Sequence, residues 1–141
     1  MIDFDGVTVT PLKVHADHRG LLVEVFRAPW AVLASEGQVY LTTAAVGAVK
    51  GNHFHRRKTE WFCVLQGAAE ICLSDPSTGA SGRIPLDGRR PGVVRIPPMV
   101  AHAVRNTGTE TLMLLAYISE AFDPRDPDTY PWEASERGNP P

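Results

Sequence analysis

Short apolar segments alternate with polar turns along most of the chain, and few windows sustain the 3.6-residue period of an amphipathic helix. Many of these segments are rich in β-branched and aromatic residues, which favour strands. The pattern predicts strands at 7–14, 21–27, 38–45, 48–55, 60–65, 68–73, 93–96, 103–105 and 112–119. We therefore expect an all-β domain of short antiparallel strands, of the kind that forms a jelly roll or a small barrel.

Turn-forming residues separate the predicted strands. Twelve glycines and twelve prolines are spread through the chain, and polar loops are expected at 66–67, 75–82, 87–92 and 106–108. One short helical turn is predicted at 29–34, because a proline opens it and a glycine follows its end. After Ser119 the sequence becomes rich in Pro and Asp, which predicts an irregular tail that cannot join a central strand. Its aromatic residues are expected to hold part of it against the domain or a partner subunit: Phe122, Tyr130 and Trp132.

Size and charge narrow the possible functions. A chain of 141 residues and 15.4 kDa without a shift in composition predicts one domain, 1–141, with flexible ends at 1–6 and 133–141. Fourteen basic against sixteen acidic residues give a formal charge of -2 with no long like-charge block, which argues against a nucleic-acid partner. The longest apolar run, 112–118, is far below the roughly 20 residues of a membrane helix. With no charged-then-apolar leader at the start, we expect a soluble cytoplasmic protein without a membrane partner.

The two cysteines indicate no chemistry. Cys63 and Cys72 are too few for a disulfide framework and do not have the spacing of metal ligands. We expect both to be small buried hydrophobic residues.

The densest group of chemically active residues lies between Gly47 and Gly67. His53 and His55 are two residues apart, so both imidazoles project from one face of a strand. A four-residue turn follows, and Glu60 begins the return strand opposite His55. A third imidazole, His102, can come from the later segment RIPPMVAHAVRN.

Three histidines and a glutamate form a ligand set that suits divalent transition metals, with one or two positions left for water or substrate. Zinc is favoured, and iron, manganese, nickel or copper would accept the same ligands. The competing interpretation is that these histidines are merely polar residues at strand ends.

The same residues resemble the cupin motifs. The first motif, Gx5HxHx4Ex6G, is reproduced without a gap by Gly47, His53, His55, Glu60 and Gly67. The second is resembled by Pro97, His102 and Asn106, with Met99 where the motif usually has glycine. The resemblance implies a cupin jelly-roll barrel of two antiparallel sheets.

Within cupins, the chain looks most like the nucleotide-sugar epimerases. The DxRGxxxE opening of dTDP-4-keto-rhamnose 3,5-epimerases is matched by Asp17, Arg19, Gly20 and Glu24. The stretch KGNHFHRRKTEWFCVLQG and the ending FDPRDPDTY are similar to the C-terminal cupin domain of capsular-polysaccharide UDP-sugar reductases. The resemblance covers about 14–132 and implies a homodimer that moves protons next to a sugar ketone.

The resemblance also assigns roles. His53 falls on the catalytic base of the metal-free epimerases, which leaves two assignments open: His53 as base with His55, Glu60 and His102 holding the metal, or all four as ligands with another group as base. Arg19 resembles an arginine that contacts the nucleotide diphosphate, a task that suits its planar guanidinium, although a structural pair with Asp17 or Glu24 is equally compatible with the sequence. The full set of expected substrate-binding residues is Arg19, Glu24, Lys50, Asn52 and Arg95.

Two family features are missing. The acid tyrosine of the rhamnose-pathway epimerases aligns near Ala116 or Ala121, and strand alternation turns the adjacent Tyr117 to the opposite face. The acidic partner of their catalytic histidine is also not found, so a double 3,5-epimerase is not expected. There is no GxGxxG, so no reductase half is expected here.

The sequence thus predicts an enzyme that epimerises or isomerises a nucleotide-linked 4-keto-6-deoxy sugar with a bound metal. A neutral imidazole would remove a proton beside the ketone, and a metal or cation would stabilise the enolate. Two alternatives remain: a metal-dependent cupin of natural-product biosynthesis, such as a polyketide cyclase or an iron dioxygenase, and a non-catalytic sugar-binding cupin.

Overall fold

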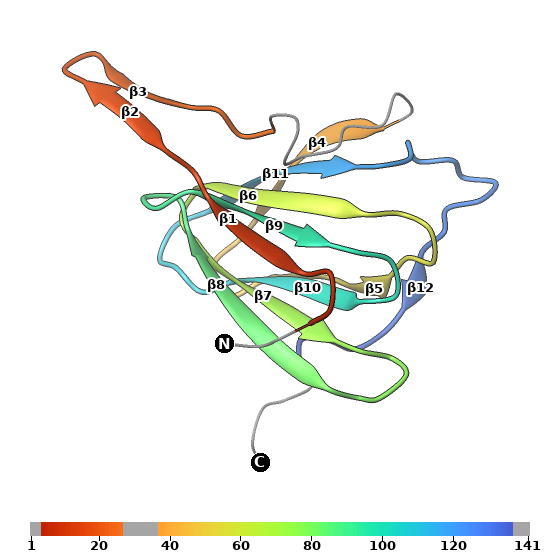
Figure 1. The fold of residues 1–141 in the computed structure, drawn as a ribbon. Helices are drawn as coiled ribbons and strands as arrows, with labels where there is room; N and C mark the ends of the chain where they lie inside the picture. Colours follow the sequence, from red (N-terminus) through yellow and green to blue (C-terminus); the bar gives the residue numbers. More distant parts are fainter. Residues whose placement is uncertain (1–3, 27–36, 137–141) are drawn as a thin grey trace.

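Two five-stranded antiparallel sheets face each other, and a separate two-stranded hairpin extends from them (Figure 1). The computed structural model describes residues 4–26 and 37–136. Sheet I has the strand order β1-β9-β6-β11-β4, sheet II has the order β12-β5-β10-β7-β8, and the hairpin is β2-β3. The strands are β1 (Thr8–Pro11), β2 (Val14–Asp17), β3 (Gly20–Val23), β4 (Gln38–Ala44), β5 (Val49–Phe54), β6 (Glu60–Gln66), β7 (Ala68–Ser74), β8 (Ser81–Asp87), β9 (Gly92–Ile96), β10 (Ala101–Asn106), β11 (Leu112–Ile118) and β12 (Tyr130–Pro131).

The main core lies between the two sheets. Successive side chains of a strand point to opposite faces, so alternate residues of each strand turn inward. The inward residues form one apolar cluster that includes Phe62, Val64, Ile71, Leu73, Val94, Ile96, Leu112 and Leu114. Burial of these side chains is the main force that holds the sheets together.

The outer face of sheet I is covered as well. Trp61, Cys63 and Tyr117 are buried there, and Leu12, Val25 and Phe26 of the N-terminal segment pack against them. Trp61 therefore points away from Glu60 and packs under the N-terminal segment of its own chain. Cys63 and Cys72 are free and buried, as the sequence predicts.

The all-β prediction is confirmed, and the arrangement is consistent with a jelly roll. The described strands form two separate sheets, however, and not the closed barrel that was expected, because β4 and β8 each pair with only one neighbour and end their sheets there. The predicted helical turn at 29–34 lies outside the described residues. Within 4–26 and 37–136, no helix is long and apolar enough to cross a membrane.

One strand was missed by the sequence analysis. β8 overlaps the ends of the loops expected at 75–82 and 87–92 and fills the segment between them, to which no strand was assigned, and it contains Gly82 and Pro85. It pairs only with β7, so it is an edge strand, where a proline removes no hydrogen bond that the sheet needs. The expected first strand at 7–14 is also divided, because β1 ends at Pro11 and β2 begins at Val14.

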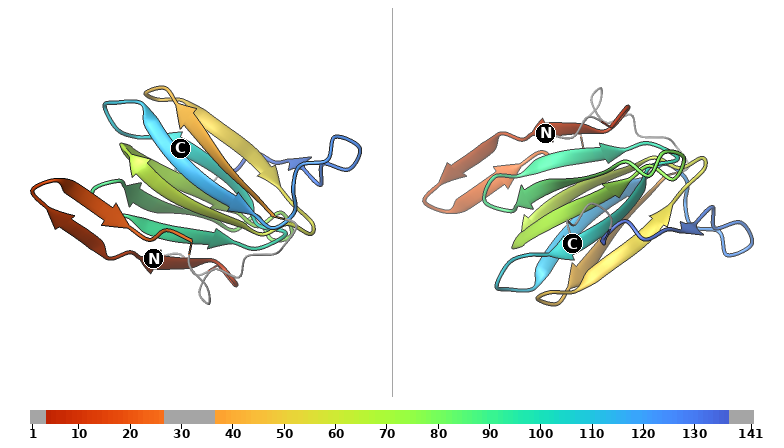
Figure 2. Two further views of the ribbon diagram at one scale, coloured as in Figure 1. Left: turned by 90° about the horizontal axis from the view of Figure 1, so that it is seen from above. Right: turned by 90° about the horizontal axis from the view of Figure 1, so that it is seen from below.

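The hairpin β2-β3 stands away from the two sheets. Figure 1 shows it at the upper left, and both views in Figure 2 show it extending beyond the sheet strands. Leu21 and Leu22 on β3 are exposed by 69% and 59%. Much apolar surface of this hairpin is therefore accessible in the single chain.

The C-terminal tail crosses sheet II and joins its edge. Tyr130 pairs with Phe54 as β12 lines up beside β5, and the two rings stack with their centroids 5.4 Å apart. Trp132 packs against a second outer cluster, whereas Phe122 is 65% exposed. Two of the three aromatic residues thus hold the tail, as expected. Ala134 and Ser135, within the segment expected to be a flexible end, are buried.

Candidate functional site

The four predicted ligands converge between the two sheets. His53 lies on β5 and pairs directly with His102 on the neighbouring β10. His55 follows β5, and Glu60 begins β6 in the opposite sheet. One ligand atom from each of the four residues can be chosen so that all lie within 4.8 Å of one another. The four residues that were grouped from the sequence therefore lie together, but β5 and β6 form no hairpin: the chain crosses from sheet II to sheet I between His55 and Glu60, so that Glu60 faces the histidines from the other sheet.

A β-bulge in β5, directly before His53, sets the position of this residue. The register between β5 and β10 shifts between His102 and Ala103, so that Asn52 is an extra residue on β5. Gly51 and Asn52 both have positive φ angles, 103° and 58°. A Cβ atom on Gly51 would lie 3.0 Å from the carbonyl oxygen of His102, so a residue without a side chain is needed at this close approach.

The two carboxylate oxygens of Glu60 face three neighbours, two of them histidines and the third a tyrosine. Oε1 lies 2.5 Å from Nε2 of His55 and 3.9 Å from Nε2 of His102. Oε2 accepts a hydrogen bond of 3.1 Å from the hydroxyl of Tyr40. Burial raises the pKa of the Glu60 carboxyl, but the hydrogen bond from His55 and the positive charge of the imidazoles outweigh it and lower the pKa.

Two imidazoles are fixed by backbone carbonyls. Nδ1 of His55 donates a hydrogen bond of 2.6 Å to the carbonyl of Asp128, and Nδ1 of His102 donates one of 3.0 Å to the carbonyl of Val100. Nε2 of each ring therefore faces the cluster. Nε2 of His102 is buried and has no hydrogen-bond partner in the described part of the chain. A buried nitrogen that gives up hydrogen bonding to water loses free energy unless another partner binds it.

This arrangement fits a metal. Metal-ligating histidines usually donate their other ring N–H to a carbonyl or carboxylate, which fixes the ring and the tautomer. His55 and His102 both show that pattern, and Glu60 supplies an anionic oxygen. Nitrogen and carboxylate oxygen are donors that divalent transition metals accept. The cluster could therefore hold such an ion.

Burial controls the protonation of the imidazoles. Burial and the neighbouring imidazole of His102 lower the pKa of His53 to about 4. Burial also lowers the pKa of His102. Burial acts in the same direction on His55, but the hydrogen bond and the negative charge of Glu60 outweigh it and raise the pKa of His55. His53 and His102 are thus neutral near neutral pH, which is the form that binds a metal or accepts a proton.

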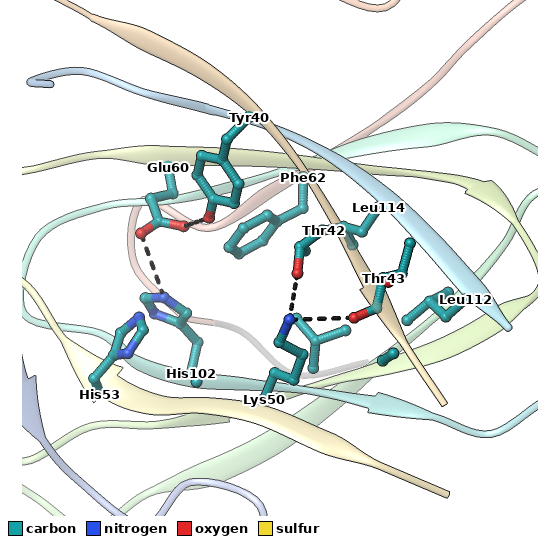
Figure 3. A pocket seen from close by; sticks show the side chains of 13 residues that line it. Tyr40, Thr42, Thr43, Lys50, His53, Glu60, Phe62, His102, Leu112 and Leu114 are labelled. Carbon is teal, nitrogen blue, oxygen red and sulfur yellow. Dashed lines mark hydrogen bonds and ion pairs between the residues drawn. The ribbon is translucent and has the colours of Figure 1, made fainter. Parts of the chain in front are cut away.

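The cluster opens into a pocket of about 160 Å³ between the sheets (Figure 3). Apolar side chains form much of its wall, among them Phe62, Leu112 and Leu114. Lys50 lies toward the other end, where its ammonium group donates hydrogen bonds to the hydroxyl of Thr42 at 2.5 Å and to the carbonyl of Thr43 at 3.2 Å. The pocket thus joins a histidine–glutamate cluster to a lysine through an apolar passage. The complete lining is Tyr40, Thr42, Thr43, Ala44, Lys50, Gly51, His53, Glu60, Phe62, His102, Val104, Leu112 and Leu114.

Tyr40 is the site residue that the sequence analysis missed. It lies on β4, directly opposite Ala116 of β11, and its ring enters the pocket. Burial and the charge of Glu60 raise the pKa of its phenol. Tyr117 faces the outer side of sheet I, as predicted. The period-2 pattern of 38–45 could have marked Tyr40 as inward-facing, but its partner lies in a strand 20 residues later.

Two of the expected substrate-binding residues, Asn52 and Arg95, make contacts within the fold. The side-chain oxygen of Asn52 accepts hydrogen bonds from the N–H groups of Ala134 and Ser135, and this amide fastens the tail to the bulge. Arg95 donates a hydrogen bond of 2.7 Å to the carbonyl of Gly6, and its guanidinium lies over the ring of Trp61 on the outer face of sheet I. Neither side chain is part of the pocket wall.

Arg19 and Glu24 also lie away from the pocket of their own chain. Arg19 is at the turn of the hairpin β2-β3, where it forms an ion pair of 2.6 Å with Asp17 and its side chain is 79% exposed. Glu24 directly follows β3. Of the five expected substrate-binding residues, Lys50 is the one that the structure places in the pocket wall.

The two facing sheets and the histidine–glutamate cluster between them define a cupin-like fold, of the kind found in nucleotide-sugar epimerases. The chain belongs to the family described as the polysaccharide biosynthesis C-terminal domain, whose model matches residues 15–130. The resemblance drawn from the sequence motifs is thereby confirmed.

Three relatives show the range of this similarity. UDP-2-acetamido-2,6-beta-L-arabino-hexul-4-ose reductase of Pseudomonas aeruginosa is 34% identical over 84% of this chain and 31% of its own length. The spore coat polysaccharide biosynthesis protein SpsL of Bacillus subtilis is 27% identical over 92% of this chain and 90% of its own. The capsular polysaccharide assembling protein CapF of Staphylococcus aureus has a crystal structure that matches with a TM-score of 0.69 and 31% identity, over 87% of this chain and 34% of its own.

The chain therefore spans about a third of the length of the reductase and of CapF. A crystal structure of a double mutant of ChmJ, a 3′-monoepimerase from Streptomyces bikiniensis, in complex with dTDP matches with a TM-score of 0.78 at 19% identity, over 89% of this chain and 69% of its own, which shows a shared fold. The relatives are named for sugar and polysaccharide biosynthesis, in agreement with the predicted sugar-nucleotide enzyme.

Proposed function

We propose that the chain is a metal-binding cupin that epimerises or isomerises a nucleotide-linked 4-keto-6-deoxy sugar by moving a proton beside the ketone. The observation that carries the proposal is the position of His53. Among the four clustered residues, His53 is the half-buried one, and its ring lines the pocket. The base of such a reaction needs this combination of access to substrate and shelter from water.

His53 would take the proton from the carbon next to the ketone. Its lowered pKa keeps the imidazole neutral near neutral pH, and the carboxylate of Glu60 stabilises the imidazolium that forms. The electrons of the broken C–H bond move into the enolate. Return of a proton to the opposite face of the same carbon gives epimerisation. Ketone migration needs two transfers: the former ketone carbon takes the proton from the imidazolium, and the former ketone oxygen takes the proton of the hydroxyl on the neighbouring carbon, which becomes the new carbonyl.

His55, Glu60 and His102 would hold the metal, with zinc as the first candidate. A bound divalent ion supplies positive charge that favours the enolate. These three side chains are buried, so their task is to hold and orient. The second assignment, with His53 as a fourth ligand, differs in its consequence: replacement of His53 would then reduce metal content as well as proton transfer.

The pocket and the relatives support a sugar linked to a nucleotide. A cavity of about 160 Å³ is smaller than the roughly 300–1,000 Å³ that enclose a drug-sized ligand, so the sugar ring would enter and the nucleotide would stay outside. Lys50 supplies a positive charge in the wall for an anionic part of the substrate. The reductase of Pseudomonas aeruginosa is named for a UDP-linked ketosugar, and the ChmJ structure contains dTDP.

The apolar wall of the pocket supports a second candidate, a metal-dependent cupin of natural-product biosynthesis. Phe62, Leu112 and Leu114 would suit a substrate with little polar surface. This candidate requires no affinity for nucleotides. Titration of the protein with dTDP and UDP separates the two candidates, because saturable binding is expected under the first and none under the second.

We also propose a homodimer. β4 ends sheet I in the described residues, and Val39 and Leu41 on its outer side are exposed by 58% and 54%. These two residues, and separately the exposed leucines of the hairpin, are apolar surface that a second copy would cover. Sedimentation analysis of the wild-type protein and of Leu41→Lys tests this, with a dimer and a weakened dimer as the expected results.

The proposed reaction is tested by deuterium uptake. The protein is incubated in heavy water with a 4-keto-6-deoxy sugar linked to dTDP or to UDP, and exchange beside the ketone is followed by NMR. We expect exchange with the wild-type protein and its loss in His53→Ala, while His15→Ala, at an exposed position of the hairpin, exchanges normally. No exchange with either nucleotide sugar by folded, metal-loaded protein would rule out the epimerase.

A further inference from the structure

The hydroxyl of Tyr40 meets Glu60 on the side away from the histidines. It donates a hydrogen bond of 3.1 Å to Oε2, while Oε1 faces Nε2 of His55 and of His102. We propose that Tyr40 is a positioning residue of the metal site: it holds Oε2 so that Glu60 presents one oxygen, Oε1, to the ion. This inference rests on the proposed metal site and adds to it a residue of β4, the strand at one edge of sheet I.

Glu60 needs such a partner more than the histidines do. The rings of His55 and His102 are fixed by backbone carbonyls, at Asp128 and Val100, which a side-chain substitution does not remove. No backbone N–H fixes Oε2 of Glu60 among the described residues, and the Tyr40 hydroxyl is its partner there. The orientation of this ligand therefore depends on one side-chain hydroxyl.

Burial of Glu60 makes its orientation depend strongly on the hydroxyl of Tyr40. Glu60 is 3% exposed, so water cannot readily replace the phenol as donor. A buried carboxylate oxygen without a donor loses charge-assisted hydrogen bonding, and the carboxylate becomes free to turn and to offer both oxygens to the cluster. Removal of the hydroxyl should thus change how Glu60 binds a metal, beyond any effect on the fold.

The register of sheet I explains why Tyr40 can do this. Tyr40 lies opposite Ala116, and Ala116 lies opposite Phe62, two residues beyond Glu60 on β6. The small side chain of Ala116 leaves space across β11, through which the long phenol of Tyr40 reaches Glu60. A shorter residue on β4 could not span the intervening strand.

Tyr40→Phe is the first test, because it removes the hydroxyl and keeps the ring. The metal-free protein is titrated with Zn²⁺ in competition with a chelator. We expect the affinity to fall by about 10- to 100-fold, the usual effect of removing a partner that orients a ligand. Tyr117→Phe is the matched control, since it makes the same change on β11 but on the outer face of the sheet, and we expect it to leave the affinity unchanged.

Two spectroscopic measurements separate positioning from a general loss of structure. With Co²⁺ in place of zinc, Tyr40→Phe should show a changed visible absorption spectrum, whereas Tyr117→Phe should keep the wild-type spectrum. In the wild-type protein, the infrared difference spectrum on Zn²⁺ binding should show the wide carboxylate splitting of one-oxygen coordination, and this band should vanish in Glu60→Gln. Because the infrared measurement is made on the wild-type protein, it remains informative even if Tyr40→Phe does not fold.

The results separate a failure of the proposed role of Tyr40 from a failure of the proposed metal site. Wild-type zinc affinity and cobalt spectrum in Tyr40→Phe, or a carboxylate splitting typical of two-oxygen coordination, would overturn the role of Tyr40 and leave the metal site standing. A wild-type protein that binds neither Zn²⁺ nor Co²⁺ would overturn the metal site itself, and the role of Tyr40 with it.

Discussion

The imidazole of His55 is held in place by Asp128, a residue 73 positions further along the chain. The backbone carbonyl of Asp128 accepts the hydrogen bond from Nδ1 of His55, and its buried carboxylate accepts hydrogen bonds from the N–H groups of Arg56, Arg57 and Lys58. One tail residue thus fixes both the turn after β5 and a candidate metal ligand. The tail is therefore part of the site although it supplies no ligand.

We expect Asp128→Asn to destabilise the protein in a pH-dependent way. Burial disfavours the charged carboxylate, but the three backbone N–H groups outweigh it and lower the pKa of Asp128 below its ordinary value of 3.8. The group therefore contributes stability that is present above 3.8 and is lost as the pH falls through the lowered pKa. Urea unfolding should show a loss of about 1–3 kcal/mol at neutral pH.

The same comparison at low pH supplies the check. Well below 3.8 the wild-type carboxyl is protonated and resembles the amide, so the two unfolding free energies should converge. Asp126→Asn serves as control, because Asp126 forms an ion pair of 3.1 Å with Arg57 but is 61% exposed, and such pairs contribute little. A penalty for Asp128→Asn that stays constant with pH would show that its charge is unimportant.

The contacts on either side of one turn, between β5 and β6, could be predicted from the sequence. The two-residue spacing of His53 and His55 places both rings on one face of a strand, and a four-residue turn returns the chain at Glu60. These relationships depend on local geometry, which spacing determines. The sequence also offered His102 as a third imidazole, but no spacing within one segment places it beside His53, since it lies in a separate strand.

The contacts between distant segments could not be predicted in this way. Tyr40 reaches Glu60 across β11, and Asp128 reaches His55 from the tail, so both depend on the strand order and register of the whole fold. The amide oxygen of Asn52 likewise accepts a hydrogen bond from the N–H of Ala134, 82 residues further along the chain, and no local spacing reveals that contact.

Gly51→Ala should destabilise the protein and weaken metal binding. The φ angle of Gly51 is 103°, and a Cβ atom there would lie 3.0 Å from the carbonyl oxygen of His102 and 3.2 Å from Cα of Ala103. Both are backbone atoms, so the strands must separate, and we expect a loss of about 1–3 kcal/mol. Because His102 belongs to the cluster, the Zn²⁺ affinity should fall as well.

Gly79→Ala isolates the effect of the backbone angle. Gly79 has a φ of 76°, but nothing lies within 4 Å of its added Cβ, and it is in the loop between β7 and β8. We expect a smaller loss of stability and an unchanged Zn²⁺ affinity. Equal effects of the two substitutions on both quantities would contradict the close approach of β5 and β10 as the cause.

The metal-free protein should lose stability as the pH falls through the range in which His53 resists protonation. Burial and the imidazole of His102 lower the pKa of His53 from 6.5 to about 4, so between these values the unfolded chain binds the proton more readily than the folded one. The contribution of His53 is therefore fully present above 6.5 and lost on acidification. His102 acts in the same direction, and His55, whose pKa is raised, acts in the opposite one.

The variant His53→Gln separates these contributions, because it removes one of the two groups that resist protonation. Its unfolding free energy, measured in urea with a chelator present, should fall less than that of the wild-type protein between pH 6.5 and 4. His15→Gln, at an exposed position of the hairpin, should follow the wild-type curve. Parallel curves for the wild-type protein and His53→Gln would mean that His53 is protonated as easily in the folded state as in the unfolded chain. With Zn²⁺ present the wild-type curve should become steeper, since protons then compete with the metal for the same imidazoles.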